Sequence, residues 1–467
     1  MALSLYHHQK EGIAFALNRR KEKGAMLAFE QGLGKTPTAL VFSQILHRHG
    51  WNGVTLIVVP ASLIHNWKEE AWRFIGVRPH VYHGSKKKRK FTNARYVLTS
   101  YETLTTDIEL FAERYKNTEI LVIADEAHAK LQNDESQRTK AVRRLAADFL
   151  LLLTGTPISN KPEDLYSLVA LIDPALAGDK DLWLSRFTNV ETRARKVRGK
   201  WGATFMVPFQ KIVGYRNLDV LHEMLSEVML RRTKEACLDL PRKQVFYLPY
   251  ELNKTKRAYV NFLDRVDDET ETRGSALVKL AYILSGVCPD TGHFVKSDKF
   301  DVLKTILEGT DKPMIIWCKY KLTIEALKSW IIDKPTFVHT GEQTAGQRHQ
   351  VIQEFKQTPG AVLLATIESG GVGLNLTEAK TSVFYETNYT VSSNEQAEDR
   401  IHRIGQDEDV NIYYLYGRNT IEEGIIKLLK EKSHTNKVVI TGDRKGRDEI
   451  QNYSYSVGTG MASWAFA

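Results

Sequence analysis

Two glycines, a lysine and a threonine lie together in FEQGLGKTPTAL, residues 29–40 of the 467-residue chain. Glycines let backbone N–H groups approach a phosphate, a lysine can reach the outer phosphates of a nucleotide, and a hydroxyl can hold Mg²⁺. An apolar segment precedes the glycines and a helical pattern follows them, so these N–H groups would lie at a helix N-terminus, which attracts anions. The alternative is a glycine-rich turn with a solvated lysine, because Phe29 occupies the place of the first glycine in the usual pattern. The predicted ATP-binding residues here are Gly32, Leu33, Gly34, Lys35 and Thr36, and Thr36 is also a predicted ligand of Mg²⁺.

Two adjacent acids, Asp125 and Glu126, directly follow the apolar run at 120–124. A nucleotide loop requires a carboxylate at the end of a neighbouring strand, both to hold Mg²⁺ and to position water. We expect Asp125 to coordinate the metal through water and Glu126 to orient and deprotonate the attacking water. An acidic cap between a strand and a helix is the alternative. His128 does not complete an H-E-x-x-H pattern, which argues against a zinc protease.

A second group of charged residues lies near the other end of the chain, in NEQAEDRIHRIGQ at 394–406. If this stretch is a helix, Gln396, Arg400 and Arg403 share one face, because they are spaced at i, i+4 and i+7. Phosphoryl transfer from ATP is often completed by an arginine that a second unit supplies. Arg400 lies 365 residues after Lys35, so this role would require two lobes that close on one another. A surface helix that carries two arginines is the alternative.

Apolar runs alternate with amphipathic stretches in both halves of the chain, and these elements must position the charged residues. Strands that alternate with helices imply a parallel sheet with helices on both faces, so the pattern predicts an α/β fold with two such domains. The predicted strands are 24–29, 55–59, 96–99, 120–124 and 149–153, then 314–317, 336–339, 362–365, 382–385 and 411–416. The predicted helices are 37–48, 62–74 and 136–149, then 321–332, 343–356, 394–402 and 419–431.

Composition limits the class of protein. Lys and Arg number 65 and Asp and Glu 56, which gives a net charge of +9 and favours a polyanionic partner. The three cysteines have no zinc-ligand spacing and argue against a disulfide framework, so a reducing compartment is expected. The N-terminus has no apolar signal core, and no apolar run reaches the roughly 18 residues of a membrane helix. We therefore expect a soluble protein.

From about residue 3 to about residue 430, the ordered motifs resemble those of the Swi/Snf-type ATPases of helicase superfamily two. LSLYHHQKEGIAFAL resembles the adenine-reading glutamine motif, with Gln9 in the key place. EQGLGKT resembles motif I, in which this family has no glycine at the place of Phe29 either. LIVVPASLIHNWKEE, VLTSYETL, DEAH and LLLTGTPISN resemble motifs Ia, Ib, II and III, and VMLRRTKEACLDLPRK resembles the connection to the second lobe. VHTGEQTAGQRHQVIQEF resembles the segment after motif IV, LLATIESGGVGLNLTEAKTSVFYE motif V, and QAEDRIHRIGQ motif VI.

The resemblance implies two RecA-like lobes, each a parallel sheet with helices on both faces, with a helical and hairpin insertion between them. It implies lobe 1 at 1–175, the insertion and linker at 176–300, lobe 2 at 301–440 and a tail at 441–467. It further implies that ATP and Mg²⁺ bind between the lobes and that DNA crosses both. The implied catalytic residues are Lys35, Asp125, Glu126, Arg400 and Arg403. Gln9, Gln396 and Gly373 are also implied to bind ATP, and Asp125 and Thr36 to bind Mg²⁺. The residues implied to couple DNA binding to ATP hydrolysis are His128, Thr154, Gly155 and Thr156.

DNA contact in such a motor uses the sugar–phosphate backbone and does not read sequence. The resemblance implies contacts from loops that follow the strands. These residues are Ser62, Thr99, Ser100 and Tyr101 in lobe 1, and Thr340, Gly341, Arg348, Thr366 and Ser369 in lobe 2. Each could also be an ordinary loop residue.

One basic stretch stands apart from these motifs. RARKVRGKWG, residues 193–202, places five basic residues around Trp201, and 194–209 could form a hairpin. Basic residues beside an aromatic side chain suit a DNA fork or a single strand. An exposed wedge is therefore a hypothesis for this segment.

The leading prediction is an ATP-dependent DNA translocase or helicase that remodels branched DNA in recombination or repair. One alternative is a duplex translocase that displaces or slides DNA-bound proteins, and another is an ATP-gated DNA clamp that does not translocate. An RNA helicase is disfavoured, because the chain reads HRIGQ where RNA helicases of the DEAD type usually read H-R-x-G-R. We expect a monomer without membrane contact, cytoplasmic in a bacterial or phage-infected cell or nuclear in a eukaryote.

Overall fold

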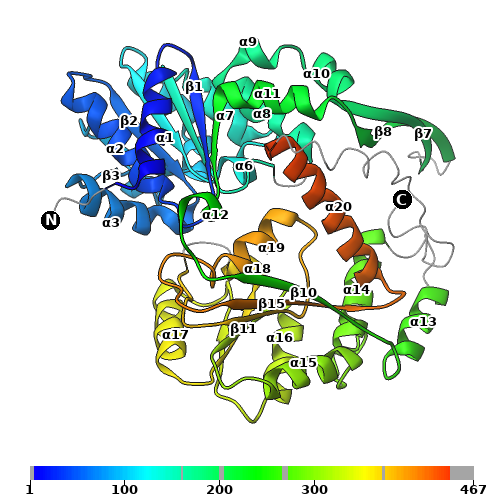
Figure 1. The fold of residues 1–467 in the computed structure, drawn as a ribbon. Coiled ribbons are helices and arrows are strands. Elements are labelled where there is room, and N and C mark those ends of the chain that lie inside the picture. The colour runs from blue at the N-terminus through cyan, green and yellow to red at the C-terminus, as the bar shows by residue number, and fades with distance from the viewer. Residues whose placement is uncertain (1–4, 159–160, 199–203, 266–271, 371–373, 442–467) are drawn as a thin grey trace. The chain divides into compact units, whose positions relative to one another are not determined.

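The computed structural model describes residues 5–158, 161–198, 204–265, 272–370 and 374–441 (Figure 1). Two compact units divide these residues. The described residues of the first unit run to Thr233 and resume at His434. Those of the second unit run from Lys234 to Ser433.

A seven-stranded sheet organises the first unit, in the order β3-β4-β2-β5-β6-β1-β9. Every neighbouring pair is parallel. All residues of β1, β5 and β6 are buried, as expected of strands covered on both faces. The strands are β1 Gly24–Phe29, β2 Val54–Val59, β3 His80–Val81, β4 Tyr96–Ser100, β5 Ile120–Ala124, β6 Phe149–Thr154 and β9 Met229–Arg232.

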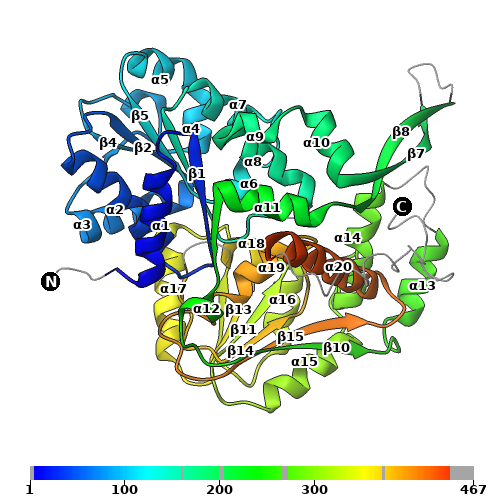
Figure 2. The same cartoon turned by 45° about the horizontal axis from the view of Figure 1, so that its top comes forward.

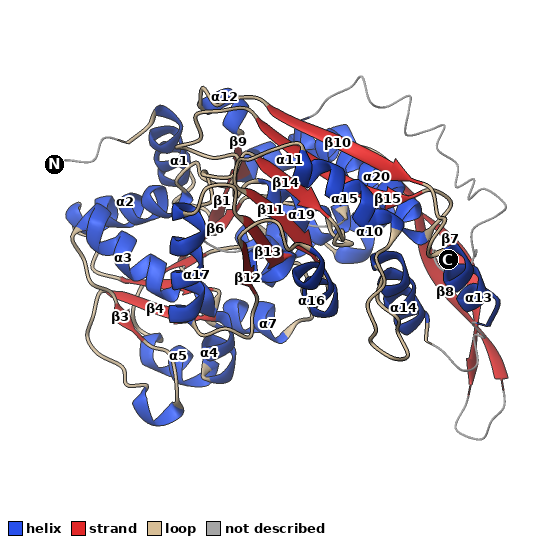
Figure 3. Ribbon diagram, turned by 90° about the horizontal axis from the view of Figure 1, so that it is seen from below, coloured by secondary structure: helices blue, strands red, loops and turns tan. Residues whose placement is uncertain are grey.

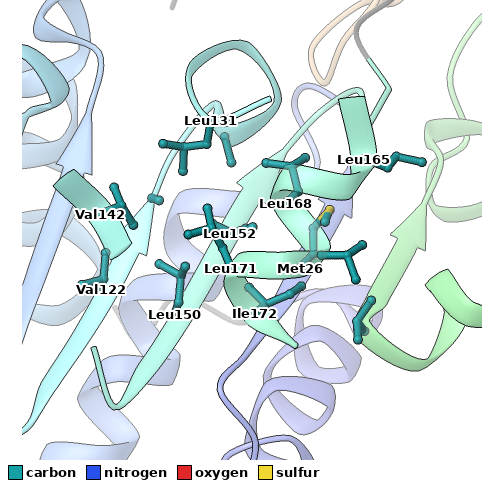
Figure 4. Packing of buried hydrophobic residues seen from close by; sticks show 14 of the residues in the cluster. Met26, Val122, Leu131, Val142, Leu150, Leu152, Leu165, Leu168, Leu171 and Ile172 are labelled. Atoms are coloured by element: carbon teal, nitrogen blue, oxygen red, sulfur yellow. The ribbon is translucent and has the colours of Figure 1, made fainter. Parts of the chain in front are cut away.

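Helices flank this sheet (Figure 1). Figure 4 shows part of the resulting core, in which Val122, Leu150 and Leu152 of the strands face Leu168 and Ile172 of α8. The helices are α1 His7–Asn18, α2 Lys35–Arg48, α3 Ile64–Ile75, α4 Tyr101–Thr106, α5 Ile108–Tyr115, α6 Ala127–Lys130, α7 Gln137–Arg144, α8 Leu165–Ile172, α9 Pro174–Ala177, α10 Lys180–Phe187 and α11 Leu218–Val228, with short 3-10 turns at Ala61–Leu63, Lys86–Lys88 and Pro162–Asp164.

A six-stranded parallel sheet organises the second unit, in the order β10-β15-β14-β11-β13-β12 (Figure 3). Its strands are β10 Lys243–Tyr250, β11 Met314–Cys318, β12 Thr336–His339, β13 Val362–Thr366, β14 Thr381–Phe384 and β15 Val410–Gly417. The helices from here on are α12 Lys234–Cys237, α13 Lys256–Arg265, α14 Arg273–Ser285, α15 Asp298–Glu308, α16 Lys321–Trp330, α17 Ala345–Gln357, α18 Ile367–Gly370, α19 Val391–Glu398 and α20 Ile421–Thr441.

A two-stranded antiparallel hairpin, β7 Thr188–Arg198 and β8 Thr204–Tyr215, extends from α10 of the first unit (Figure 2). It belongs to neither parallel sheet.

The predicted fold class, two parallel sheets flanked by helices with a hairpin insertion, is confirmed. Two expected helices end four or five residues earlier than predicted. The helix expected at 394–402 ends at Glu398, so Arg400 and Arg403 lie in the turn beyond it. The helix expected at 136–149 ends at Arg144, because Phe149 already begins β6.

The segment 176–300, expected to be an insertion and linker, also supplies a strand to each sheet, β9 and β10. Of the expected tail at 441–467, Thr441 ends α20 and the rest lies outside the described residues. Within the described residues, no helix has both the length and the apolar composition needed to cross a membrane.

Candidate functional site

The loop between β1 and α2 has the backbone shape that a phosphate-binding loop requires. Gly32 has a φ of 88° and Gly34 a φ of 76°, both in the left-handed region that favours glycine. Gly34 is the N-cap of α2, and no side chain caps the helix there. The first-turn N–H groups of a helix have no partners within it, and the helix dipole favours an anion beside them. This end of α2 can therefore hold a phosphate.

Helix α1 holds the phosphate loop from one side. His8 Nε2 lies 2.8 Å from Leu33 O, and Gln9 Nε2 donates to the same carbonyl at 3.3 Å. A Cβ placed on Gly34 would lie only 2.1 Å from Gln9 Nε2. The predicted glutamine therefore packs on the loop, and a side chain at position 34 would displace it. Lys35 Nζ donates to Phe29 O at 2.9 Å, which keeps the amine over the loop.

The two predicted catalytic acids lie at the C-terminal end of β5. Asp125 is buried, and Glu126 adopts a left-handed backbone with a φ of 50°. Such a conformation is costly for a residue other than glycine and is concentrated at functional sites. Trp67 Nε1 donates to Asp125 Oδ2 at 2.8 Å, and the Tyr101 hydroxyl donates to Asp125 O at 2.7 Å. The first acid is therefore held through its side chain and its backbone.

Electrostatics distinguish Asp125 from an ordinary surface acid. Burial and then the charge of Glu126 raise the pKa of Asp125 to about 6, while Lys35 and the Trp67 indole oppose this rise. Burial also raises the pKa of Glu70, which forms hydrogen bonds with Asn66 and Thr36 and feels the charge of Asp125. The two carboxyl groups and the Thr36 hydroxyl therefore lie in one neighbourhood.

These oxygen groups fit Mg²⁺. The metal prefers hard oxygen ligands and is usually held by one or two carboxylates together with substrate phosphates. Asp125 and Thr36 supply such oxygens beside the phosphate loop, and Glu70 adds a carboxyl group that sequence reasoning did not select.

A polar network connects Glu126 to the end of β6. Gln31 Nε2 donates to Glu126 Oε1 at 3.3 Å, and His128 Nδ1 lies 3.5 Å from Glu126 Oε2. His128 Nδ1 lies 2.8 Å from Thr154 Oγ1, which accepts from Thr156 N at 3.1 Å. Burial lowers the pKa of His128 to about 3, and the charge of Lys35 adds to the effect. A neutral histidine, itself a predicted coupling residue, therefore lies between the predicted base and Thr154.

Gly155, the third predicted coupling residue, lies close to the phosphate loop. A Cβ at this position would lie 3.2 Å from Gln31 Cγ and 3.4 Å from Lys35 Nζ. Arg231 of β9 contacts the same segment, because its Nη1 donates to Gly155 O at 2.6 Å and to Ala28 O at 3.0 Å. The structure brings the predicted binding, catalytic and coupling residues of the first unit together.

In the second unit, the two predicted arginines converge on one carbonyl. Arg400 Nη1 donates to Leu374 O at 3.3 Å and Arg403 Nη1 donates to the same atom at 2.9 Å. Arg400 and Arg403 therefore lie together, although not on the helical face that the spacing predicted. Gln396 remains on α19. Gly373 lies outside the described residues.

The residues predicted to contact DNA differ in exposure within the first unit. Ser62 is exposed on the 3-10 turn Ala61–Leu63. Thr99, Ser100 and Tyr101 are buried, and their hydroxyl groups have partners inside the unit. Side chains this buried can reach DNA only after the local backbone moves. Their DNA contact stays a prediction.

The predicted DNA residues of the second unit gather at adjacent strand ends. His339 of β12 pairs with Ala365 of β13, so Thr340 and Thr366 follow at the same edge of the sheet. Thr366 Oγ1 donates to Ser369 Oγ at 2.7 Å. Gly341 is exposed. Burial, followed by the charge of Arg348, lowers the pKa of His339 to about 4, which places Arg348 at the same edge.

Sequence reasoning missed Trp67, Glu70 and Arg231. Trp67 and Glu70 are three apart on α3, and that spacing places them on one helical face. The spacing was a usable signal for a shared role, but nothing in it pointed to Asp125, which lies 58 residues later. Arg231 gave no signal, because its partners lie 76 and 203 residues earlier.

Family comparisons agree on two domains. The SNF2-related domain matches residues 8–288, and the helicase conserved C-terminal domain matches residues 298–405. Similar curated proteins include an uncharacterized ATP-dependent helicase of Mycoplasma pneumoniae, 29% identical over 92% of this chain and 41% of that protein. Another is the human DNA annealing helicase and endonuclease ZRANB3, 27% identical over 94% of this chain and 40% of that protein. The chain thus spans about two fifths of the length of these relatives.

Among solved structures, the chain is similar to the Sulfolobus solfataricus SWI2/SNF2 ATPase core in complex with dsDNA. The two are 25% identical, the match covers 95% of this chain and 94% of that one, and the TM-score is 0.46.

Proposed function

The chain belongs to the SNF2-related domain family, and we propose that it is an ATP-dependent DNA translocase or helicase that remodels branched DNA. The observation that carries the proposal is the cluster in the first unit that combines an uncapped helix N-terminus, Lys35, and the acids Asp125 and Glu126. This set contains the groups that ATP hydrolysis requires: an anion cradle, a cation and a base.

We assign nucleotide binding to the first unit. The N–H groups before and within the first turn of α2 bind the phosphates, and Lys35 moves from the loop carbonyls to the β- and γ-phosphates. Gln9 contacts the adenine. Asp125 and Thr36 would hold Mg²⁺, which neutralises charge on the phosphates when bound.

Glu126 acts as the general base for hydrolysis. Its carboxylate accepts a proton from water as the water oxygen bonds to the γ-phosphorus, and the bond from that phosphorus to the bridging oxygen breaks to release ADP. Gln31 holds the Glu126 carboxylate in orientation through a hydrogen bond to Oε1, and neutral His128 lies beside the other carboxylate oxygen. Arg400 and Arg403 stabilise the charge that develops on the transferred group, as arginine fingers do.

DNA is contacted through its backbone by Thr340, Thr366, Ser369 and Arg348 in the second unit and by Ser62 in the first. His128, Thr154 and Thr156 couple DNA binding to the catalytic Glu126. Hydrogen bonds join these three residues to one another, and His128 lies beside the Glu126 carboxylate. The human relative is named a DNA annealing helicase, which favours branched DNA as the substrate. Displacement of proteins from duplex DNA is the second candidate function.

ATP hydrolysis measured with different nucleic acids tests the proposal. The series is no nucleic acid, single-stranded DNA, blunt duplex, forked DNA, a four-way junction and structured RNA. We expect the strongest stimulation from forks or junctions. Equal stimulation by blunt duplex would favour the protein-displacing translocase, and stimulation by RNA alone would contradict a DNA motor.

Two variants test the site assignment in the same assay. Lys35→Ala should abolish hydrolysis, and Glu126→Gln should retain ATP and DNA together because chemistry stops. The matched control is Glu113→Gln on α5, whose side chain is 73% exposed. Normal turnover in Lys35→Ala would remove the site assignment.

A further inference from the structure

The hairpin β7–β8 is anchored at its base in the core of the first unit. Phe187, which directly precedes β7, is 2% exposed and belongs to the hydrophobic core, and Tyr215 at the end of β8 packs against the same core. The Tyr215 hydroxyl donates to Glu163 Oε2 at 3.0 Å, and Arg216 N donates to Phe187 O at 3.0 Å. The strands are therefore fixed at one end to a rigid body.

Away from this base, the hairpin exposes apolar side chains. Phe205 is 57% exposed, Met206 60% and Phe209 37%, and every residue of 204–210 is exposed. Alternate residues of a strand point to opposite faces, so neither face of this part of β8 is covered by other described residues. A two-stranded sheet with both faces in water is marginally stable and gains from a partner.

The same strands concentrate positive charge. β7 and β8 contain five basic residues and one acidic residue, a net charge of +4, whereas the whole chain carries +9. Arg193 pairs in backbone register with Phe209, so a basic residue lies directly across from an aromatic one. Residues in register point to the same face, so one face presents both a cation and an aromatic ring.

We propose that this hairpin binds the unpaired bases of single-stranded DNA where a strand leaves a duplex. Aromatic rings stack on unpaired bases, and a cationic surface attracts the phosphates between them. Phe205 and Phe209 supply the rings. Arg193 and Lys211 supply positive charge, which Glu191 offsets in part because it accepts from Arg193 at 3.0 Å and lies opposite Lys211 in register. A purely apolar partner surface would gain nothing from the charge, and a blunt duplex offers few bases to stack on. The inference rests on the proposed DNA motor and deepens it, because it names the DNA structure that the motor engages.

The double variant Phe205→Ala/Phe209→Ala tests the proposal in the full chain. The probe is a forked DNA with 2-aminopurine in its single-stranded arm, and the readouts are fluorescence quenching and affinity. We expect the variant to lose the quenching and to bind the fork about tenfold or more weakly, because stacking is lost. ATP hydrolysis stimulated by blunt duplex should be unchanged. Leu110→Ala on α5, at a side chain 55% exposed, is the matched control.

Two further variants keep the test decisive if alanines disturb the fold. Phe205→Leu/Phe209→Leu keeps apolar area but removes the rings and should also lose quenching. Arg193→Gln/Lys211→Gln should weaken fork binding and its salt dependence while quenching persists at saturation. Unchanged fork affinity and quenching in both phenylalanine variants would overturn the proposal and leave the apolar surface to a protein partner. Failure of the proposed motor is distinguishable, because it would remove duplex-stimulated hydrolysis from the unaltered protein.

Discussion

The orientation of the Asp125 side chain is fixed by a hydrogen bond from Trp67 of α3. Its Oδ2 accepts from the Trp67 indole, and its Oδ1 accepts from Glu126 N at 2.9 Å. Trp67 is 1% exposed, so water does not compete for the indole N–H. A carboxylate with both oxygens engaged in this way has one rotamer and presents its remaining lone pairs in a fixed direction.

Trp67→Phe should preserve the aromatic packing but remove the donor to Asp125. We expect kcat to fall by about tenfold or more, because a hydrogen bond to a charged group is worth about 1.5–3 kcal/mol, and the Mg²⁺ concentration needed for half-maximal rate to rise. Steady-state hydrolysis against Mg²⁺ and binding of a fluorescent ATP analogue without Mg²⁺ measure the two effects. Trp72→Phe on the same helix, at a side chain 52% exposed, is the control. Identical Mg²⁺ dependence in the two variants would contradict the positioning role.

His128 connects protonation to stability. Burial lowers its pKa from 6.5 to about 3, so the unfolded chain binds the proton between these values and the folded chain does not. Stability therefore falls as pH is lowered from about 6.5 towards 3, by at most about 1.4 kcal/mol per pH unit. His128→Asn should flatten this slope in urea unfolding followed between pH 7.5 and 4.5. His49→Asn, at the exposed end of α2, is the control, and equal slopes in all three proteins would refute the assignment.

At the scale of elements, ion pairs with lysines of other segments hold the end of α19 and the turn after it. Lys234 Nζ lies 2.8 Å from Asp399 Oδ1, and Lys243 Nζ lies 2.9 Å from Glu398 Oε2. The charge of Glu398 raises the pKa of Lys243 above its ordinary value, so this cation is permanent. These pairs end the helix where its pattern alone would continue.

Gln406, the last residue of HRIGQ, connects this turn to the segment that resembles motif V. It is 5% exposed, and its Nε2 donates to Ile401 O at 2.8 Å, Thr377 O at 3.1 Å and Ala379 O at 3.2 Å. The two hydrogens of the amide nitrogen are shared among these three carbonyls, and the amide oxygen accepts from Asp407 N and Glu408 N, whereas an arginine has no acceptor. Gln406, the residue of HRIGQ that disfavours an RNA helicase, therefore also stabilises the turn that contains Arg400 and Arg403.

Arg403→Ala tests the function of that turn. We expect turnover to fall by about 10³-fold or more while ATP affinity changes little, as for arginine fingers. Single-turnover hydrolysis and equilibrium ATP binding separate the two. Arg418→Ala, at a side chain 57% exposed, is the control. An equal loss in affinity and turnover would indicate a binding role instead.

At the scale of the molecule, the positive charge is spread unevenly. The hairpin strands carry +4 of the +9, and α17 adds the half-buried Arg348 near the predicted DNA residues of the second unit. Contacts to phosphates release counterions and carry no sequence information. The charge distribution therefore favours DNA binding that depends on salt and DNA structure more than on base sequence.

DNA affinity should fall steeply with salt and hardly vary with sequence. The slope of log affinity against log salt should be about −0.7 per phosphate contacted on single strands and about −0.9 on duplexes. Fluorescence anisotropy from 50 to 300 mM salt, with oligonucleotides of unrelated sequence, measures both properties. A strong preference for one sequence at constant salt would contradict backbone tracking.

Local patterns in the chain were sufficient for much of the fold and for part of the site. The strands at 24–29 and 120–124 match β1 and β5, because uninterrupted apolar runs bounded by polar residues leave little choice in a parallel sheet. The residues of the phosphate loop are neighbours in the sequence, and so are the two acids after β5. Residue type and order are therefore sufficient to predict each group.

Long-range packing settled the rest. Trp67 meets Asp125 across 58 residues, and β9 joins β1 across about two hundred, so neither pairing leaves a local trace. The end of α19 depends on Lys234 and Lys243 from far upstream, which is why periodicity alone extended that helix too far. Sequence patterns indicate which residues can do chemistry. Contacts between distant segments determine how those side chains are oriented, because the orientation depends on partners that come near only when the chain folds.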